Sequence, residues 1–453
     1  MRMPPRPPDP QALIGAMFAD RTKRLRLFDR PKIGIEPYEH WDRIRFLPPP
    51  DGLSADEHWA LAWLSRNQLR QDLPFADKIG APFSWCEIPG FHRAFHEIDS
   101  DARGTLGSPN PHVTADAGER YLFRSLVEEP YWSSVIEGAA TTRAIAKQLI
   151  EERIEPRNRD ERMVLNNFRA LEFVRVHRDA DLSPEFLFEL HRIITQDTLD
   201  RPDRVGVYRL SEDPVRVVDE TNGEVLFEPP PAHELPQRIE RLCAFANRDR
   251  AKGAFVHPIV EAIVLHFMLA YDHPFWDGNG RCARALFYWS VLKHGYWLLE
   301  YVSISTIIRK APVQYGRAFL LTETDSSDLT YFIEYHLRVL RLAIGELHLY
   351  LEQRSREGAV VAERLGELRD ELNNRQIQIL ADALKRQGGR YTIAEHERVH
   401  HISYLTARAD LEDLVARRFL RKSKEGQRSI YKPVTDFARR LNLANRSRSS
   451  SRR

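Results

Sequence analysis

Apolar residues recur at helical spacing along most of the chain, which predicts a mainly α-helical protein. The segment 258–271 is the strongest example, because apolar residues share one helical face at four positions: Ile259, Ile263, Phe267 and Ala270. Pro274 disfavours the α conformation of the residue before it, so this core helix should end at His273. A second helical pattern begins at Arg281, so a short loop should join the two helices.

One segment interrupts the helices with the pattern of a β-hairpin. Valines alternate within 215–218, a turn containing Asn222-Gly223 follows, and a second apolar run covers 225–227. Asn-Gly is the residue pair most typical of a tight hairpin turn. Three prolines at 229–231 bar a continuing central strand. The sequence therefore predicts a short hairpin ahead of the core helix.

The pattern divides the chain into five regions. An N-terminal helical region covers 1–120, with a proline-rich start that should be disordered or extended and a helix from about 55 to 73. The helical region that holds the core helix covers 121–350. A charged connecting helix (351–372), a C-terminal module (373–435) and a basic tail (436–453) complete the chain.

The C-terminal module has the pattern of a winged helix-turn-helix. It predicts three helices and a two-stranded wing, at 375–384, 393–398, 403–418 and 419–431. Four apolar residues should form a buried stripe on the third helix: Leu405, Leu411, Leu414 and Val415. Seven basic residues of the third helix and wing would suit phosphate contacts: Arg408, Arg417, Arg418, Arg421, Lys422, Lys424 and Arg428. Acidic residues share the helix, so DNA binding and a protein-binding or structural role both stay open.

Composition narrows the class of protein. A chain of 453 residues with 42% hydrophobic and 29% charged residues is typical of a soluble globular protein of several domains. The net charge of +2 shows no overall bias toward nucleic acid or a membrane surface. The three cysteines have no metal-ligand or disulfide spacing, and no apolar run approaches membrane-spanning length. We therefore expect a cytoplasmic protein with no membrane partner.

A twelve-residue stretch from His273 to Arg284 carries the clearest chemistry. It combines an imidazole, a carboxylate, two glycines around an asparagine and two arginines: His-Pro-Phe-Trp-Asp-Gly-Asn-Gly-Arg-Cys-Ala-Arg. The glycines let the backbone bend tightly, and the helix that follows places unpaired N–H groups at Asn279 and Gly280. These parts suit a site that holds a polyphosphate and deprotonates a hydroxyl beside it.

This stretch resembles, at every defined position, the Fic-family motif His-x-Phe-x-Asp/Glu-Gly-Asn-Gly-Arg-x-x-Arg. Similar residues at 206–209, 257–258 and 328–330 extend the resemblance to about 125–435. It implies a Fic-type helical bundle in 121–350, with the hairpin as a flap beside the active site, and an appended winged helix-turn-helix.

The resemblance implies a protein adenylyltransferase that moves AMP from ATP to Tyr, Thr or Ser hydroxyls of a target protein, including its own. His273 would be the general base, and Asp277 would hold Mg²⁺ between the α- and β-phosphates. Five residues would bind the phosphates: Gly278, Asn279, Gly280, Arg281 and Arg284.

A second motif bears on regulation. Ser133, Glu137 and Gly138 are similar to the family's inhibitory pattern, Ser/Thr-x-x-x-Glu-Gly/Asn. A glutamate on an adjacent helix can pair with Arg284 and occupy the place of the γ-phosphate, so we expect autoinhibition through Glu137.

Other functions stay open. The protein could remove AMP, alone or besides adding it, with Glu137 orienting water, or transfer a different phosphate-containing group. It could also be a DNA-binding regulator whose Fic fold senses a nucleotide without turnover. A homodimer is left open as well.

Overall fold

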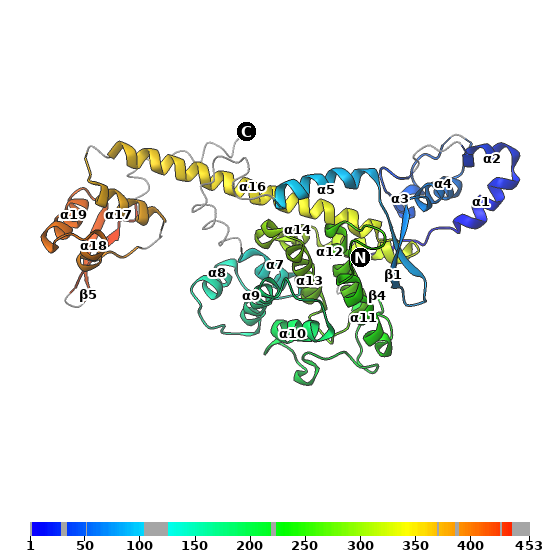
Figure 1. Cartoon of the computed structure of the whole chain (residues 1–453), viewed down its shortest axis with the longest axis horizontal. Coiled ribbons are helices and arrows are strands. Elements are labelled where there is room, and N and C mark those ends of the chain that lie inside the picture. Colours follow the sequence, from blue (N-terminus) through cyan, green and yellow to red (C-terminus); the bar gives the residue numbers. More distant parts are fainter. Residues whose placement is uncertain are drawn as a thin grey trace. The chain divides into compact units, whose positions relative to one another are not determined.

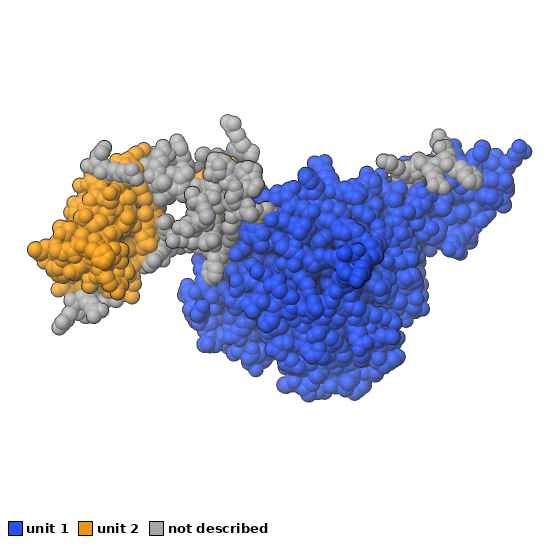
Figure 2. Space-filling model, in the orientation of Figure 1, with its two compact units in different colours: residues 1–109, 118–348 blue, residues 110–117, 349–453 orange. Residues whose placement is uncertain are grey.

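The structure is a computed structural model that describes residues 2–28, 34–50, 52–103, 126–218, 223–368, 371–385, 389–425 and 428–436. The chain divides into two compact units, 1–109 with 118–348 and 110–117 with 349–453 (Figure 2). Helices dominate the described residues, and their strands form three separate two-stranded antiparallel sheets. The prediction of a mainly α fold is confirmed.

The first hundred residues contain helices and one hairpin: α1 (Pro10–Ala19), α2 (Arg21–Phe28), α3 (Trp41–Ile44), α4 (Ala55–Asn67), β1 (Arg70–Ala76), β2 (Pro82–Cys86) and α5 (Pro89–Ala102). The prediction of a helix from 55 to 73 was wrong beyond Asn67, because β1 begins at Arg70. Pro74 disfavours the helical conformation at Leu73, and burial of alternate residues then favours a strand.

The rest of unit 1 is a helical bundle: α7 (Glu128–Ile136), α8 (Arg143–Glu151), α9 (Arg159–Val176), α10 (Pro184–Thr195), α11 (Leu235–Ala246), α12 (Pro258–Asp272), α13 (Asn279–Lys293), α14 (Ile304–Lys310), α15 (Pro312–Thr324) and α16 (Thr330–Glu367), which continues beyond the unit. Three 3₁₀ turns connect them, at Pro202–Arg204, Ala232–Glu234 and Trp297–Tyr301. Helices α12 and α13 lie in the middle of this bundle (Figure 1).

Helices α12 and α13 form the core of the bundle, since the residues on nearly every face of both helices are buried. Ile259, Ile263 and Phe267 have no exposed surface, as the periodicity predicted. Each such side chain contributes roughly 1.5–3 kcal/mol when fully removed from water. The two helices are therefore a rigid base for the loop that joins them.

The hairpin predicted before the core helix is present. Strand β3 (Val217–Val218) pairs antiparallel with β4 (Val225–Phe227). The predicted turn residues 219–222 lie outside the described residues. Phe227 packs on Tyr271 with ring centroids 4.9 Å apart, so the hairpin lies beside the end of α12.

Unit 2 contains the helices and strands expected for the C-terminal module: α17 (Asn374–Lys385), α18 (Ile393–His400), α19 (Tyr404–Ala416), β5 (Leu420–Glu425) and β6 (Arg428–Pro433). Its core combines buried residues from all parts of the module, including Leu380, Leu411, Leu414 and Tyr431. The expected connecting helix is the last part of α16, which ends at Glu367. The basic tail lies outside the described residues, apart from Asp436.

One residue of the predicted stripe on α19 does not belong to it. Leu411 and Leu414 are fully buried, but Leu405 is 74% exposed. Six residues separate Leu405 from Leu411, which places them about 120° apart around a helix of 3.6 residues per turn. Ala407 has the buried position on that side instead.

Among the described residues, no helix is long and apolar enough to span a lipid bilayer.

The two leucines of α19 give a matched test of this core. Leu411→Ala should destabilise unit 2 by about 2–5 kcal/mol, because it leaves a cavity, whereas Leu405→Ala should change stability by less than about 0.5 kcal/mol. Hydrogen exchange of α17–α19, measured by mass spectrometry on the full chain, should accelerate at least about 30-fold only in Leu411→Ala. Equal acceleration in both variants would contradict the assigned packing.

Candidate active site

The loop between α12 and α13 starts with a strained residue. Helix α12 ends at Asp272, as Pro274 predicted, and His273 is left-handed, with φ 47° and ψ 55°. A non-glycine residue pays for this conformation, so its surroundings must hold it in place. Arg209 does so, because its Nε donates to the His273 carbonyl at 2.8 Å and its backbone N–H donates to the Pro274 carbonyl at 2.8 Å.

The same turn orients the His273 ring. Its Nδ1 lies 3.1 Å from the carbonyl oxygen of Ala270, and a carbonyl can only accept. Nδ1 therefore carries the proton, and in the neutral ring Nε2 keeps a free lone pair. Burial lowers the pKa of His273 below its usual value, which favours that neutral form at physiological pH.

Two side chains close the loop from within. The Asn279 amide donates to the Phe275 carbonyl at 2.8 Å and accepts from the Phe275 N–H at 2.9 Å. Phe275 is fully buried and stacks on His191 with centroids 4.0 Å apart. The Asn279 side chain thus holds the loop, and only its backbone N–H is left for an anion.

His191 on α10 is a positioning residue that the sequence analysis missed. Its Nδ1 accepts from the Gly206 N–H at 2.8 Å, so its Nε2 is the donor to the Asp277 carbonyl at 3.0 Å. Burial lowers the pKa of His191 to about 4, which keeps the ring neutral in this role. It joins the segment before Arg209 to the loop after His273.

The start of α13 is built to receive an anion. Gly278 precedes the helix at φ 81°, a conformation that favours glycine. The first three N–H groups of the helix, those of Asn279, Gly280 and Arg281, have no hydrogen-bond partner within the described part of the chain. Such groups and the helix dipole attract negative charge.

Two buried arginines follow on the same helix. Arg281 makes only long contacts, 3.4 Å to the Ile194 carbonyl and 3.4 Å to Asp277 Oδ2, and its Nε is buried without a partner. Arg284 is 1% exposed, and its Nε and NH2 donate to residues of α7 and its C-cap. Arg281 therefore keeps hydrogen-bonding capacity that an incoming phosphate can use.

Asp277 is the carboxylate of the loop. Its side chain is 45% exposed, and Oδ1 accepts from the Gly278 N–H at 2.5 Å. No group of three or more metal-ligating His, Cys, Asp or Glu side chains occurs among the described residues. Its exposed carboxylate is the group of the loop that could hold a cation such as Mg²⁺, which takes one carboxylate and further ligands from phosphate and water.

Arg284 is held by the two residues of the second motif. Its NH2 group donates to Glu137 Oε1 at 2.8 Å and to the Ser133 carbonyl at 3.2 Å, and its Nε donates to Ser133 Oγ at 2.9 Å. Glu137 is the C-cap residue of α7, and Gly138 follows it at φ 92°. The pair of Glu137 with Arg284 was expected from the sequence, whereas the two bonds from Arg284 to Ser133 were not.

The Glu137 carboxylate lies directly over the start of α13. A β-carbon added to Gly280 would come within 2.4 Å of Glu137 Oε1 and 3.2 Å of Arg284 NH1. Glycine at this position therefore lets a carboxylate approach both the helix N-terminus and the buried arginine. An acidic group of the chain itself occupies the place best suited to an anion.

Helix α7 is anchored so that Glu137 keeps this position. Buried Glu129 accepts from Ser305 Oγ at 2.6 Å, from the Ser305 N–H at 3.0 Å and from Ser303 Oγ at 2.9 Å, which ties α7 to the start of α14. Asn167 of α9 donates to Ser134 Oγ at 2.8 Å. These bonds make α7 a fixed part of the bundle.

Comparison with known proteins identifies the domain that carries this loop. Residues 181–291 match the model of the Fic/DOC family. These residues are a Fic domain. They include His191, Arg209, the hairpin and the complete 273–284 stretch, whereas α7 with Glu137 precedes them.

Similar proteins support the Fic assignment. The chain is 26% identical over 185 residues to a protein named Protein adenylyltransferase Fic from Nematostella vectensis, covering 39% of this chain and 40% of that protein. It is 27% identical over 211 residues to a protein of the same name from Drosophila yakuba, covering 45% of this chain and 39% of that protein. The chain thus spans about two fifths of the length of these relatives.

A solved structure supports the fold. A Fic family protein from Desulfovibrio desulfuricans superposes with a TM-score of 0.51 at 21% identity, covering 78% of this chain and 98% of that one. At this identity the likeness concerns the fold alone.

The geometry around His273 in the Fic domain predicts the pKa and the tautomer of its ring. The ring should be neutral at pH 7 as the Nδ1–H tautomer, with a pKa below about 6.5, because burial disfavours the charged form. The Glu137 carboxylate raises this pKa, so Glu137→Gly should lower it further. Nitrogen-15 NMR of the histidine rings reports both tautomer and midpoint. An Nε2–H tautomer, or a midpoint that rises in Glu137→Gly, would refute the assignment.

Proposed function

We propose that the protein transfers AMP from ATP to a hydroxyl group of a target protein, and that Glu137 inhibits this reaction. The observation that carries the proposal is the Glu137 carboxylate, which lies over Gly280 and pairs with buried Arg284 at 2.8 Å. Because a carboxylate oxygen fits this place, an oxygen of a bound phosphate could fit it as well. The names of the relatives, protein adenylyltransferase, support the reaction.

ATP would bind with its phosphates at the start of α13. The free N–H groups of Asn279, Gly280 and Arg281 would donate to phosphate oxygens, and Arg281 would add its unused donors. Arg284 would bind the terminal phosphate once Glu137 has left it. Asp277 would hold Mg²⁺, which neutralises phosphate charge and polarises the α-phosphorus.

His273 would act as the base. Its free Nε2 would take the proton of the target's Tyr, Thr or Ser hydroxyl as that oxygen attacks the α-phosphorus. The new bond joins the hydroxyl oxygen to the α-phosphorus, and the bond from this phosphorus to the bridging oxygen breaks, releasing pyrophosphate. The target carries AMP, and the proton on His273 is lost to solvent. Residues 121–350 would supply all these groups.

Inhibition would follow from competition for Arg284. The γ-phosphate and Glu137 need the same donor, and a carboxylate beside a phosphate repels it. Ser133 would hold the arginine in the inhibited position through Nε. ATP would then bind productively only when the Glu137 side chain rotates away.

Hydrolytic removal of AMP is a second candidate function, because one oxygen of the Glu137 carboxylate has no hydrogen bond to Arg284. Oε1 holds Arg284, while Oε2 has no hydrogen-bond partner in the described part of the chain, and the side chain is 25% exposed. That oxygen could orient a water to hydrolyse AMP from a modified protein. Glu137→Gly would then abolish removal while it releases addition, which separates the two activities.

The C-terminal module, which we propose to be a winged helix-turn-helix, is better suited to protein than to DNA. Its basic side chains are partly neutralised, because Arg417 pairs with Asp413 and Glu371, and Lys422 pairs with Glu412. At the start of α19, Leu405 at 74% and Tyr404 at 52% present apolar surface instead. We therefore favour a protein partner.

The function predicts that Glu137→Gly releases AMP transfer. Loss of a charge-assisted bond worth about 1.5–3 kcal/mol should raise the rate of autoAMPylation about 10- to 100-fold with α-labelled ATP and Mg²⁺. Intact mass spectrometry should find one AMP per modified site in Glu137→Gly and none in Glu137→Gly/His273→Ala.

The matched control is Glu128→Ala, on the same helix but paired with Arg143 rather than Arg284. It should leave the rate unchanged. No gain in Glu137→Gly, with ATP still bound, would sink the claim of an inhibited transferase.

A further inference from the structure

Beside the hairpin lies a cleft of about 900 Å³ that the proposed chemistry does not use. Distant segments line it, among them the proline-rich start of the chain between Met3 and Pro10, the turn between β1 and β2 around Lys78, strand β4 up to Glu228, and residues 323–327. In Figure 1 the N-terminus lies at this place, near α12 and β4. Pro4 is buried here, so the proline-rich start forms a wall of the cleft.

One residue of the cleft lies close to the active site along the chain. Tyr271 lines it and lies two residues before His273 on the chain. Its hydroxyl accepts from the Lys78 N–H at 3.1 Å, and its ring packs on Phe227 of β4 at 4.9 Å. A chain that pairs with the hairpin beside His273 would therefore run into this cleft.

Carboxyl groups outnumber basic groups around the cleft. Asp9, Asp77, Glu228 and Glu323 line it, together with Asp325, which is buried and already accepts from Tyr331. Only two basic residues oppose them, and one of these, Lys78, already donates to the Glu228 carbonyl at 3.2 Å and lies over the Phe227 ring at 5.4 Å. The other, Arg6, is exposed.

Glu323 is an acidic residue of the cleft whose side chain lacks a bonding partner among the described residues. It is half-buried near the end of α15 and has no hydrogen bond or ion pair in the described part of the chain. Burial raises its pKa to about 8, so the carboxyl is mostly protonated at neutral pH and ionises when a cation pairs with it. Aromatic surfaces of Trp63 and Tyr271 share the cleft and can also receive a cation.

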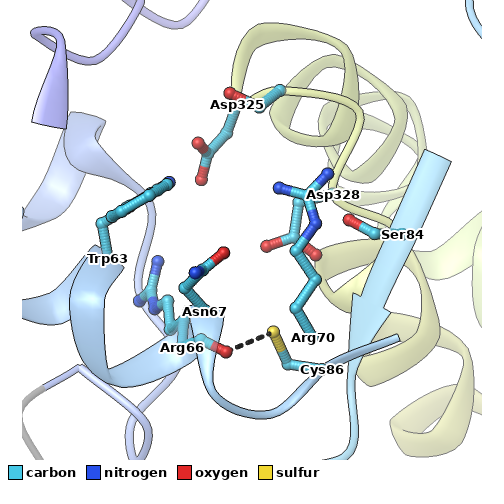
Figure 3. Close-up of a pocket in the computed structure, with 9 residues that line it drawn as sticks. Trp63, Arg66, Asn67, Arg70, Ser84, Cys86, Asp325 and Asp328 are labelled. Atoms are coloured by element: carbon cyan, nitrogen blue, oxygen red, sulfur yellow. Dashed lines mark hydrogen bonds between the residues drawn. The ribbon is translucent and has the colours of Figure 1, made fainter. Parts of the chain in front are cut away.

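A neighbouring pocket is too small to bind a peptide segment, and its carboxylates already have partners. Figure 3 shows the side chains that line it, which come from α4, β1, β2 and the loop before α16. Its volume is about 20 Å³, with room for little more than a water. Its carboxylates are already engaged, since Asp328 accepts from Tyr38 at 2.6 Å and Asp325 accepts from Tyr331 at 2.6 Å.

We propose that the cleft binds a basic, extended segment of the target protein next to its modified hydroxyl, with a lysine or arginine of that segment paired to Glu323. The occupant is extended because β4 offers strand pairing, and basic because the cleft is acidic. This inference rests on the proposed function, since it names the class of substrate for the same site.

Two fluorescent twelve-residue peptides test the proposal without turnover. Each has a central tyrosine, flanked at the same four positions by lysine in one and by glutamate in the other. Fluorescence anisotropy with the full-length His273→Ala protein should show at least about tenfold tighter binding of the lysine peptide. Glu323→Gln should weaken that binding about tenfold, whereas Glu172→Gln, a carboxylate in a separate hollow, should not.

The proline-rich start of the chain, which forms a wall of the cleft, gives a second test of the proposal. Removal of residues 2–8 should lower the affinity of the lysine peptide, because the cleft loses one side. Unchanged or tighter binding would contradict the proposal and indicate that the cleft does not use this wall or that the segment itself is the occupant. Equal binding of the two peptides, or equal effects of Glu323→Gln and Glu172→Gln, would also overturn it. Because binding is measured without AMP transfer, a failure of the proposed reaction would leave these results readable.

Discussion

A buried guanidinium needs an anion beside it, and the position of Arg284 imposes that need on the whole site. Arg284 is 1% exposed and lies on the central helix α13. Burial by itself would lower its pKa, but nearby Glu137, with Tyr315 and Glu129, raises it, so the side chain stays charged. Removing such a charge from water costs several kcal/mol, and a paired anion must offset the cost. In this structure Glu137 is that anion. Under the proposed function a bound phosphate would replace it, so Arg284 would alternate between these two partners.

The backbone around it is arranged for the same purpose. The left-handed His273, the Asn279 amide bonded to Phe275 and the glycine at 280 together place free N–H groups, an imidazole and the arginine at one helix start. His191 and Arg209 hold this loop from two other segments. The strain is local, and the buried pair α12 and α13 supports it.

Local chemistry explains which features were predictable from sequence. Pro274 sets the end of α12, and alternating valines form the hairpin. The 273–284 stretch and the glutamate four residues after Ser133 also carried their signal in short spacings. In each case the cause lies within a few residues along the chain.

Features that depend on distant contacts were missed or wrong. His191 lies on an amphipathic helix and acts through bonds to Gly206 and Asp277, which no local pattern indicates. Leu405 resembled a core residue until the orientation of α19 was known. The cleft joins residues near 6, 78, 227 and 323, so only the folded chain brings it together.

The central claim is that Glu137 takes the place of the terminal phosphate on Arg284. Isothermal titration of ATP and of AMP into wild type and Glu137→Gly tests it most directly. We predict that the substitution tightens ATP binding about tenfold or more and leaves AMP binding unchanged, because AMP has no phosphate that reaches Arg284. An equal gain for both nucleotides, or a gain for neither, would contradict the account.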